Sequence, residues 1–285
     1  DVSPFGLQSL IKSIIDAGSN VIFWAFTKKD DLPGLAELYP HRVNVFDDET
    51  PYNHPALMGE SSLTHPLSIA HLLLHGEDVL PGTADFLADA ITFLYKRNAV
   101  LDGSEKYPVW AEIYEHISSI KPFDNMTKYY RTVLCAKIRS IMHAFGPALN
   151  YRQGLDPGHT MNSNTVFVQR KVLPPRIRRF HLLEHLTRIF NYRRRHSFEE
   201  ISKMPLVVCV IDDAAEIFDA GLERKGDLPP IFEMVTMARQ YRIGFVCATQ
   251  IPELLGRAIW DNHGATICFQ LPSLESRKKV GEVMG

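Results

Sequence analysis

The stretch that decides the fold is residues 206–216, which read LVVCVIDDAAE. Its first half, residues 206–211, is a continuous apolar run of strand length, with no polar residue alternating in it. A strand that is apolar on both faces is typical of the interior of a parallel sheet that helices cover. The two carboxylates that follow, Asp212 and Asp213, are therefore expected at the carboxyl edge of that sheet, where open α/β folds bind ligands.

Similar apolar runs lie on both sides of this stretch. They occupy residues 21–26, 42–46, 165–169, 244–248 and 265–269. Segments with apolar side chains at helical spacing alternate with them, at 5–15, 32–38, 174–189, 231–241 and after Pro272. Helix alternating with strand at this spacing predicts a doubly wound α/β fold, with a mainly parallel sheet of about five strands.

The strand signals disappear between residues 66 and 146, where amphipathic helices replace them. The clearest helix signals are at 83–95, 108–120 and 125–145. We therefore expect an α/β core made of residues 1–65 and 147–285, with residues 66–146 as an all-helical insertion.

The composition limits the class of protein. The sequence holds 31 Lys and Arg against 33 Asp and Glu, so any nucleic-acid partner must be bound by a local basic patch. The apolar runs fall short of the roughly 18 residues of a membrane span, and no signal peptide opens the sequence, so we expect a cytoplasmic protein. The twelve histidines show no metal-ligand spacing. Four cysteines, Cys135, Cys209, Cys247 and Cys268, are widely separated, and the last three fall inside apolar runs typical of strands, so we expect buried, reduced thiols.

A second informative stretch, residues 238–252, reads ARQYRIGFVCATQIP. In it a helix that carries Arg precedes a strand that ends in Thr249 and Gln250, and Pro252 follows. This order and spacing resemble the HerA, FtsK and conjugative coupling group of P-loop ATPases. The likeness continues through residues 254–271. The resemblance implies a RecA-like P-loop NTPase core that hydrolyses ATP with Mg²⁺ and moves DNA.

The resemblance also implies roles for the polar residues at the strand ends. Asp212 would bind Mg²⁺, Asp213 would orient the attacking water, and Gln250 would contact the γ-phosphate as a sensor of hydrolysis. The group has Glu directly after the metal-binding Asp, and the side chain of Asp213 is one methylene shorter. Glu216 is the alternative for the water if it turns inward, and Thr249 is expected near the nucleotide.

Each of these residues has a plainer interpretation. Asp is a common residue at helix N-termini, so Asp212 and Asp213 would also serve as caps. Gln250 by itself is a loop amide. An unrelated α/β enzyme with the same acidic strand end is a further alternative, although it leaves Thr249, Gln250 and Pro252 without a reason.

The N-terminal part fits the same group but lacks its most characteristic loop. Residues 28–32 occupy the place of an Asp-rich loop and residues 52–55 that of a short Asn-Pro segment. The phosphate-binding pattern G-x-x-x-x-G-K-[ST] does not occur in the sequence. Because the helix signal at 7–17 stands where that loop gives way to its helix, we expect the loop ahead of Asp1. The alternative is a degenerate member, a scaffold that binds DNA or a ring partner without hydrolysing ATP.

Basic residues gather at the end of the helix that begins near Pro174. They are Arg193, Arg194 and Arg195. A cation at a helix C-terminus is favourable by roughly 0.3–1 kcal/mol, which explains one such residue but not a cluster. We expect a contact with the DNA backbone or with another subunit.

The resemblance implies further partners. Members of the group work as hexameric rings in which an Arg reaches the γ-phosphate of a neighbour, so a homo-hexamer or another ring is expected. The candidate arginines are Arg239, Arg242, Arg257 and Arg277. The process served would be DNA transfer, packaging or repair, with a secretion or repair protein as a possible partner.

Overall fold

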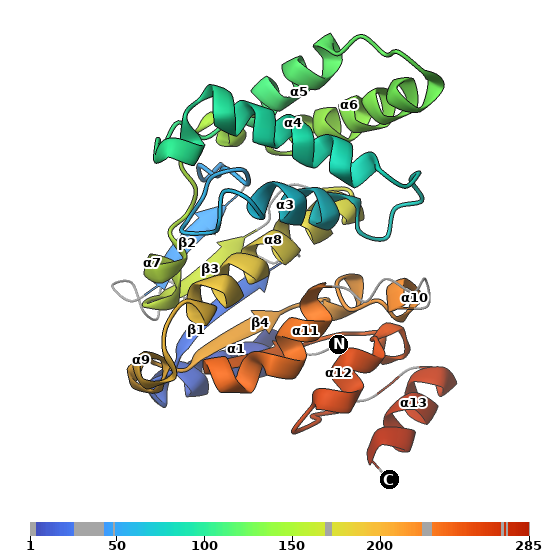
Figure 1. The fold of residues 1–285 in the computed structure, drawn as a ribbon. Coiled ribbons are helices and arrows are strands. Elements are labelled where there is room, and N and C mark those ends of the chain that lie inside the picture. Colours follow the sequence, from blue (N-terminus) through green and yellow to red (C-terminus); the bar gives the residue numbers. More distant parts are fainter. Residues whose placement is uncertain are drawn as a thin grey trace. The chain divides into compact units, whose positions relative to one another are not determined.

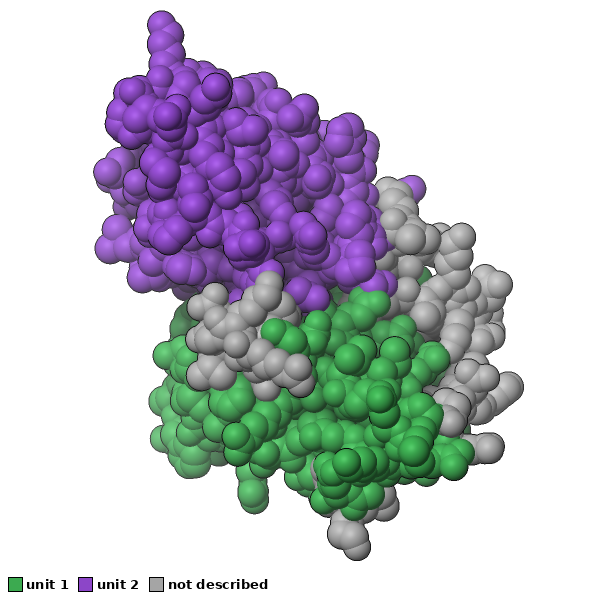
Figure 2. Space-filling view, turned by 90° about the vertical axis from the view of Figure 1, so that its right-hand side faces the viewer, with its two compact units in different colours: residues 1–47, 158–170, 189–285 green, residues 48–157, 171–188 purple. Residues whose placement is uncertain are grey.

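A computed structural model of the chain describes most of its residues. The described ranges are 4–25, 43–47, 49–168, 173–223, 230–268, 271 and 273–284. The chain divides into two compact units, shown in separate colours in Figure 2. We call them the sheet unit, residues 1–47, 158–170 and 189–285, and the helical unit, residues 48–157 and 171–188.

The sheet unit contains, within the described residues, a five-stranded sheet in which all strands run parallel (Figure 1). The strands are β1 (Asn20–Ala25), β2 (Val43–Asp47), β3 (Asn164–Val168), β4 (Val207–Ile211) and β5 (Ile243–Cys247). Their order across the sheet is β2-β3-β1-β4-β5. Trp24 pairs with Ile211, and Ile211 pairs with Cys247, so β1, β4 and β5 end at the same edge.

Apolar burial explains this arrangement. Every residue of β4 is buried, as expected for a strand with no polar face. Ile11 and Ile15 of helix α1 (Pro4–Asp16) pack in one cluster with Val21 and Phe23 of β1 and Val210 of β4. The predicted doubly wound parallel core is confirmed.

Further helices and 3-10 turns complete the sheet unit. They are α7 (Pro157–Met161), which belongs to this unit from Gly158, α9 (Phe198–Lys203), η3 (Ala214–Glu216), α10 (Ala220–Glu223), α11 (Pro230–Met237), η4 (Ala238–Tyr241), η5 (Pro252–Leu254), α12 (Arg257–Asn262) and α13 (Leu274–Met284). Helix α8 (Pro175–Arg194) belongs to the helical unit up to Arg188 and to the sheet unit from Ile189. Among the described helices, none is long and apolar enough to cross a membrane.

The helical unit has no strand among its described residues. Its elements are α3 (His65–Leu74), α4 (Thr83–Arg97), η1 (Val100–Asp102), α5 (Trp110–Ser119), α6 (Asn125–Phe145) and η2 (Gly146–Asn150), with the first part of α8. Asp124 caps α6 by accepting a hydrogen bond from the backbone N–H of Thr127 at 2.7 Å. Compared with the predicted insertion at 66–146, the unit also includes residues 48–65, 147–157 and 171–188.

The structure differs from the sequence prediction at residues 265–268. This part of the predicted strand 265–269 is irregular, and Ile267 is 70% exposed. Apolar, β-prone residues form a strand only when a neighbouring strand pairs with them, and no such pairing occurs among the described residues. Cys268 is exposed and Cys247 half-buried, so the prediction of buried thiols is wrong for Cys268. The predicted elements at 28–32 and 32–38 lie outside the described residues.

Candidate nucleotide site at the carboxyl edge

Two turns meet at the carboxyl edge of the sheet, one after β4 and one after β5. Backbone hydrogen bonds join them directly. The N–H of Ala214 donates to the carbonyl of Ala248 at 2.8 Å, and the N–H of Ala248 donates to the carbonyl of Ile211 at 2.9 Å. Asp212 and Gln250 therefore follow neighbouring strand ends, and their main chains are tied together.

Asp212 continues the sheet beyond β4, because its N–H donates to the carbonyl of Trp24 at 3.3 Å. Its Oδ1 atom accepts a hydrogen bond from the N–H of Asp213 at 3.1 Å. Asp213 has a left-handed backbone with φ 54°, which Asp tolerates better than most residues. Both side chains are half-buried. Two carboxylates thus lie at the sheet edge on a main chain that hydrogen bonds hold in place.

The helix-cap interpretation finds no support at Asp213. This residue is the N-cap of η3, yet its side chain makes no cap hydrogen bond. Glu216 is the last residue of η3 and is half-buried. The carboxylate of Asp213 therefore does not cap η3, which was the plainer interpretation of this residue.

The turn after β5 holds the amide candidate. The Oγ1 atom of Thr249 accepts a hydrogen bond from the N–H of Ile251 at 3.1 Å, so this hydroxyl serves the turn itself. Gln250 is exposed, and its side chain has no hydrogen-bond partner among the described residues. Pro252 then begins η5. The amide of Gln250 can both donate to a phosphate oxygen and accept from a water.

The basic cluster at the end of α8 divides into buried and exposed members. Arg193 is 1% exposed and donates from Nη2 to the carbonyl of Pro205 at 2.8 Å. It does not reach the surface, so the predicted DNA contact depends on Arg194 and Arg195, which are exposed. Pro205 precedes β4, which places this cluster at the amino edge of the sheet, opposite Asp212.

The candidate arginines occupy different parts of the sheet unit. Arg239 and Arg242 precede β5 and so lie at the amino edge, where Arg242 donates to the carbonyl of Ser202 at 3.2 Å. Arg277, on α13, donates to the carbonyl of Leu271 at 2.8 Å, and Arg257 pairs with Asp261. The structure does not bring Arg239 or Arg242 to the carboxyl edge of their own chain, so for them a role at the nucleotide of a neighbouring subunit stays a prediction, beside that of a surface salt bridge.

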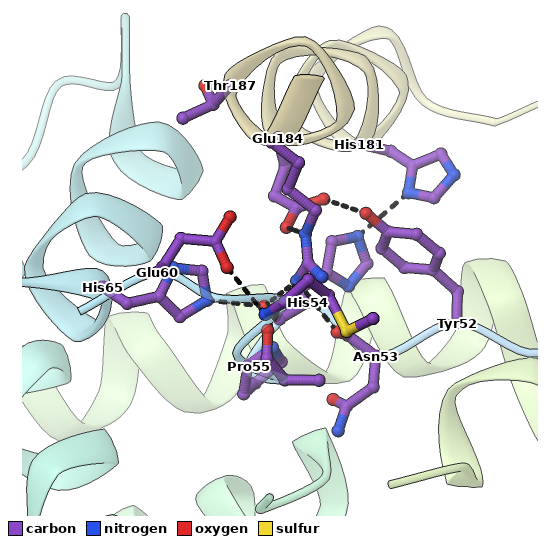
Figure 3. A network of polar contacts seen from close by, with 12 residues as sticks. Tyr52, Asn53, His54, Pro55, Glu60, His65, His181, Glu184 and Thr187 are labelled. Carbon is purple, nitrogen blue, oxygen red and sulfur yellow. Dashed lines mark hydrogen bonds and ion pairs between the residues drawn. The ribbon is translucent and has the colours of Figure 1, made fainter. Parts of the chain in front are cut away.

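A second cluster of polar residues is buried in the helical unit (Figure 3). Nη2 of Arg188 donates to three backbone carbonyls, those of Asn53, His54 and Ala56, at 3.1, 2.6 and 3.0 Å. Its Nε atom pairs with Glu184, one helical turn earlier, and the hydroxyl of Tyr52 donates to the same carboxylate. We call Tyr52, His54, His181, Glu184, His185 and Arg188 the buried network.

The histidines of the buried network are neutral. Nδ1 of His54 accepts from Nε1 of Trp110 at 3.0 Å, so its Nε2 carries the proton and donates to Nδ1 of His181 at 2.9 Å. Burial, with help from Arg188, lowers the pKa of His181 to about 3 and also lowers the pKa of His54 and of His185 well below the usual value. Burial raises the pKa of Glu184 to about 7, although Arg188 opposes the shift.

Sequence reasoning missed the buried network. Its signal was the series His181, Glu184, His185 and Arg188, whose spacing puts four polar side chains on one face of a helix. Among the described residues, no three His, Cys, Asp or Glu side chains are placed so that they could hold a metal ion. The network connects α8 to the segment 52–56, while the buried Nη1 atom of Arg188 has no hydrogen-bond partner among the described residues.

This chain is similar to known proteins in structure and not in sequence. No family model and no curated protein matches the sequence. The solved structure of VirB4 of Thermoanaerobacter pseudethanolicus aligns with 91% of this chain and 70% of that chain, with a TM-score of 0.64 and 15% identity. Two structures of the coupling protein TrwB, the unbound monoclinic form and the complex with ADP and Mg²⁺, each cover 93% of this chain and 68% of that chain. Both have a TM-score of 0.44, with 10% and 12% identity. The likeness to VirB4 shows that this chain has the fold of that protein and confirms the predicted fold class.

Proposed function

We propose that the chain is the ATP-hydrolysing core of a motor that moves DNA, with Mg²⁺ and ATP bound at the carboxyl edge of β4 and β5. The proposal rests mainly on one observation: the turn after β4, which holds Asp212 and Asp213, is hydrogen-bonded to the turn after β5, which leads to Gln250. The backbone hydrogen bonds of Ala214 and Ala248 fix the spacing between these turns. Open α/β folds bind ligands at this edge, and the fold of VirB4 agrees with the proposal.

The residues at this edge fit Mg²⁺ and part of a nucleotide. Carboxylate oxygens are the ligands that Mg²⁺ prefers, and we assign Asp212 to the metal. When bound, Mg²⁺ neutralises charge that develops on the phosphates. Asp213 accepts a proton from the attacking water and orients it, with Glu216 as the alternative. Gln250 donates to the γ-phosphate, near which we also place Thr249.

The sequence does not supply the whole phosphate site. The pattern G-x-x-x-x-G-K-[ST], whose backbone N–H groups and Lys surround the phosphates, is absent from the 285 residues. Activity is therefore tested on the full-length gene product. This absence, together with Asp213 where the resembled group has Glu, favours a second candidate, a scaffold with the same fold that binds DNA or a ring partner without hydrolysis.

We also propose the partners. Arg194 and Arg195 are exposed at the amino edge and are assigned to the DNA backbone. Copies of the chain would form a ring, most simply a homo-hexamer, in which Arg239, Arg242 or Arg277 reaches the nucleotide of a neighbour. Type IV secretion and conjugation are the processes that this motor would serve, from the cytoplasm.

The test is Mg²⁺-dependent ATP turnover by the full-length protein, with and without DNA. We expect turnover that DNA stimulates and that Asp212→Ala lowers by at least about a hundredfold. Asp261→Ala is the matched control, because it removes an exposed carboxylate that pairs only within α12. DNA binding with no Mg²⁺-dependent nucleotide affinity and no turnover above the Asp212→Ala level would favour the scaffold.

A further inference from the structure

The segment that carries Gln250 is held at its two ends by the sheet unit. At the start, Ala248 is hydrogen-bonded to the turn after β4. At the end, Leu255 forms an antiparallel bridge with Asp219, and the N–H of Gly256 donates to the carbonyl of Phe218 at 2.5 Å. Between these points the main chain turns through η5, whose N–H groups at Leu254 and Leu255 donate within the turn itself.

One side chain fixes the middle of this segment to another element. The Oε2 atom of Glu253, in η5, accepts a hydrogen bond from Oγ of Ser276 in α13 at 2.7 Å. Ser276 is 2% exposed and Glu253 is half-buried, so the donor side of this bond is shielded from water, where leaving a polar group unpaired is costly. Lys279 of the same helix lies 5.8 Å from the ring centre of Trp260, which gives α13 a second contact with the residues after Gln250.

Hydrogen bonds at the N-terminal end of α13 fix the direction in which the Ser276 hydroxyl donates. Its N–H donates to Oγ of Ser273 at 2.9 Å, and the same Ser273 hydroxyl donates to Oγ of Ser276 at 2.7 Å. The single hydroxyl hydrogen of Ser276 is therefore committed to Glu253. Glu253 thus receives a hydrogen bond of fixed direction from the first turn of α13.

We propose that Glu253 is a positioning residue for Gln250, and that the placement of α13 regulates hydrolysis through the Glu253–Ser276 hydrogen bond. The inference rests on the proposed function, because it concerns the same site. Gln250 has no side-chain partner of its own among the described residues, so its position depends on the main chain of η5. A protein partner that shifts α13 would release Glu253 and let Gln250 leave its place beside the acidic turn.

The kinetic test compares variants of the full-length protein. Ser276→Ala and Glu253→Ala are expected to lower kcat for ATP by about five- to twentyfold, with KM changed less than about twofold, because misplacement of a catalytic group affects the chemical step. Glu253→Gln keeps an acceptor oxygen and should restore most of the rate. Glu275→Ala is the matched control, since it removes an exposed carboxylate next to Ser276. In a Gln250→Ala background, Ser276→Ala should have no further effect on kcat.

A structural test does not depend on turnover. Hydrogen exchange at the N–H groups of Leu254 and Leu255 should be faster in Ser276→Ala than in the wild type or in Glu275→Ala. If the wild type hydrolyses no ATP, the proposed function fails, and exchange still decides whether Glu253 holds the segment. Unchanged exchange, or equal losses of kcat from Ser276→Ala with and without Gln250, would overturn the inference.

Discussion

The turns at the sheet edge and the buried network both bring charged side chains from distant parts of the sequence together, but they do so in opposite ways. At the sheet edge, backbone hydrogen bonds hold the main chain, and the side chains of Asp212 and Asp213 stay half-buried. In the buried network, side chains bind one another, and Glu184 and Arg188 are 1% and 3% exposed. Buried polar groups must satisfy each other, whereas groups at an edge can bind a ligand. The first arrangement suits chemistry and the second suits stability.

The largest effect expected from this difference is on stability. Arg188→Ala removes the donor to three carbonyls and leaves the buried Glu184 without its cation, so we expect the free energy of unfolding to fall by about 3–5 kcal/mol. Urea denaturation measures this change. Arg176→Ala is the control, because its guanidinium is 70% exposed and pairs with Glu77 at the surface, where such pairs contribute about 0–1 kcal/mol. Equal losses from the two variants would mean that the network does not stabilise the fold.

The second prediction concerns pH. The folded pKa of His181, about 3, lies below the unfolded value, so protons bind the unfolded chain first and stability is lost as pH falls below about 6.5. His54 and His185 act in the same direction. Glu184 acts in the opposite direction, because its folded pKa of about 7 is raised, so its contribution is lost as pH rises through 7. Arg188, whose charge acts on all four groups, stays charged throughout this pH range.

The three histidines together lose about 5 kcal/mol between pH 6.5 and 5, and Glu184 offsets about 2 kcal/mol of this loss, so we expect a net loss of about 3 kcal/mol. Thermal unfolding at stepped pH measures it. His181→Asn should make the dependence shallower, because it removes one of the suppressed titrations, whereas the exposed His71→Gln should leave the slope as it is. A steeper slope in His181→Asn would contradict the neutral state of the network.

The smallest effect should be on DNA binding. Replacing Arg194 and Arg195 by Ala should weaken DNA binding about equally for all sequences and reduce the salt slope of log K by about 2, one for each phosphate contact. Lys203→Ala, also exposed but paired with Glu199, is the control. A salt slope that does not change would remove these arginines from the DNA interface.

The sequence predicts well what depends on local pattern. The apolar run before Asp212 predicted β4, and the parallel arrangement then placed its carboxyl end at the same edge as that of β5, while their adjacency comes from the structure. Residues 265–268 show the limit, because an apolar run does not specify which strand pairs with it. Arg193 shows another limit: its position at a helix end suggested a surface residue, whereas packing beside Pro205 buries it.

The buried network could not be predicted from local sequence patterns, because its members come from distant parts of the sequence. Tyr52 and Glu184 are 132 positions apart in the sequence, and no periodicity links them. The polar face of α8 resembled a solvent-exposed one, since only the partners at residues 52–56 show that it is covered. The candidate nucleotide site was hard to predict for the same reason. The roles of Asp213 and Glu216 depend on where their side chains lie, and the spacing of residues in the sequence does not determine this.

The central claim is that Asp212 binds the metal of a nucleotide site at the carboxyl edge. Its most direct test is the affinity of the full-length protein for an ATP analogue that cannot be hydrolysed, measured with and without Mg²⁺, for the wild type and Asp212→Asn. We predict that Mg²⁺ tightens binding by about tenfold or more in the wild type and has little effect in Asp212→Asn, while both fold equally well. The same gain from Mg²⁺ in both proteins would contradict the assignment.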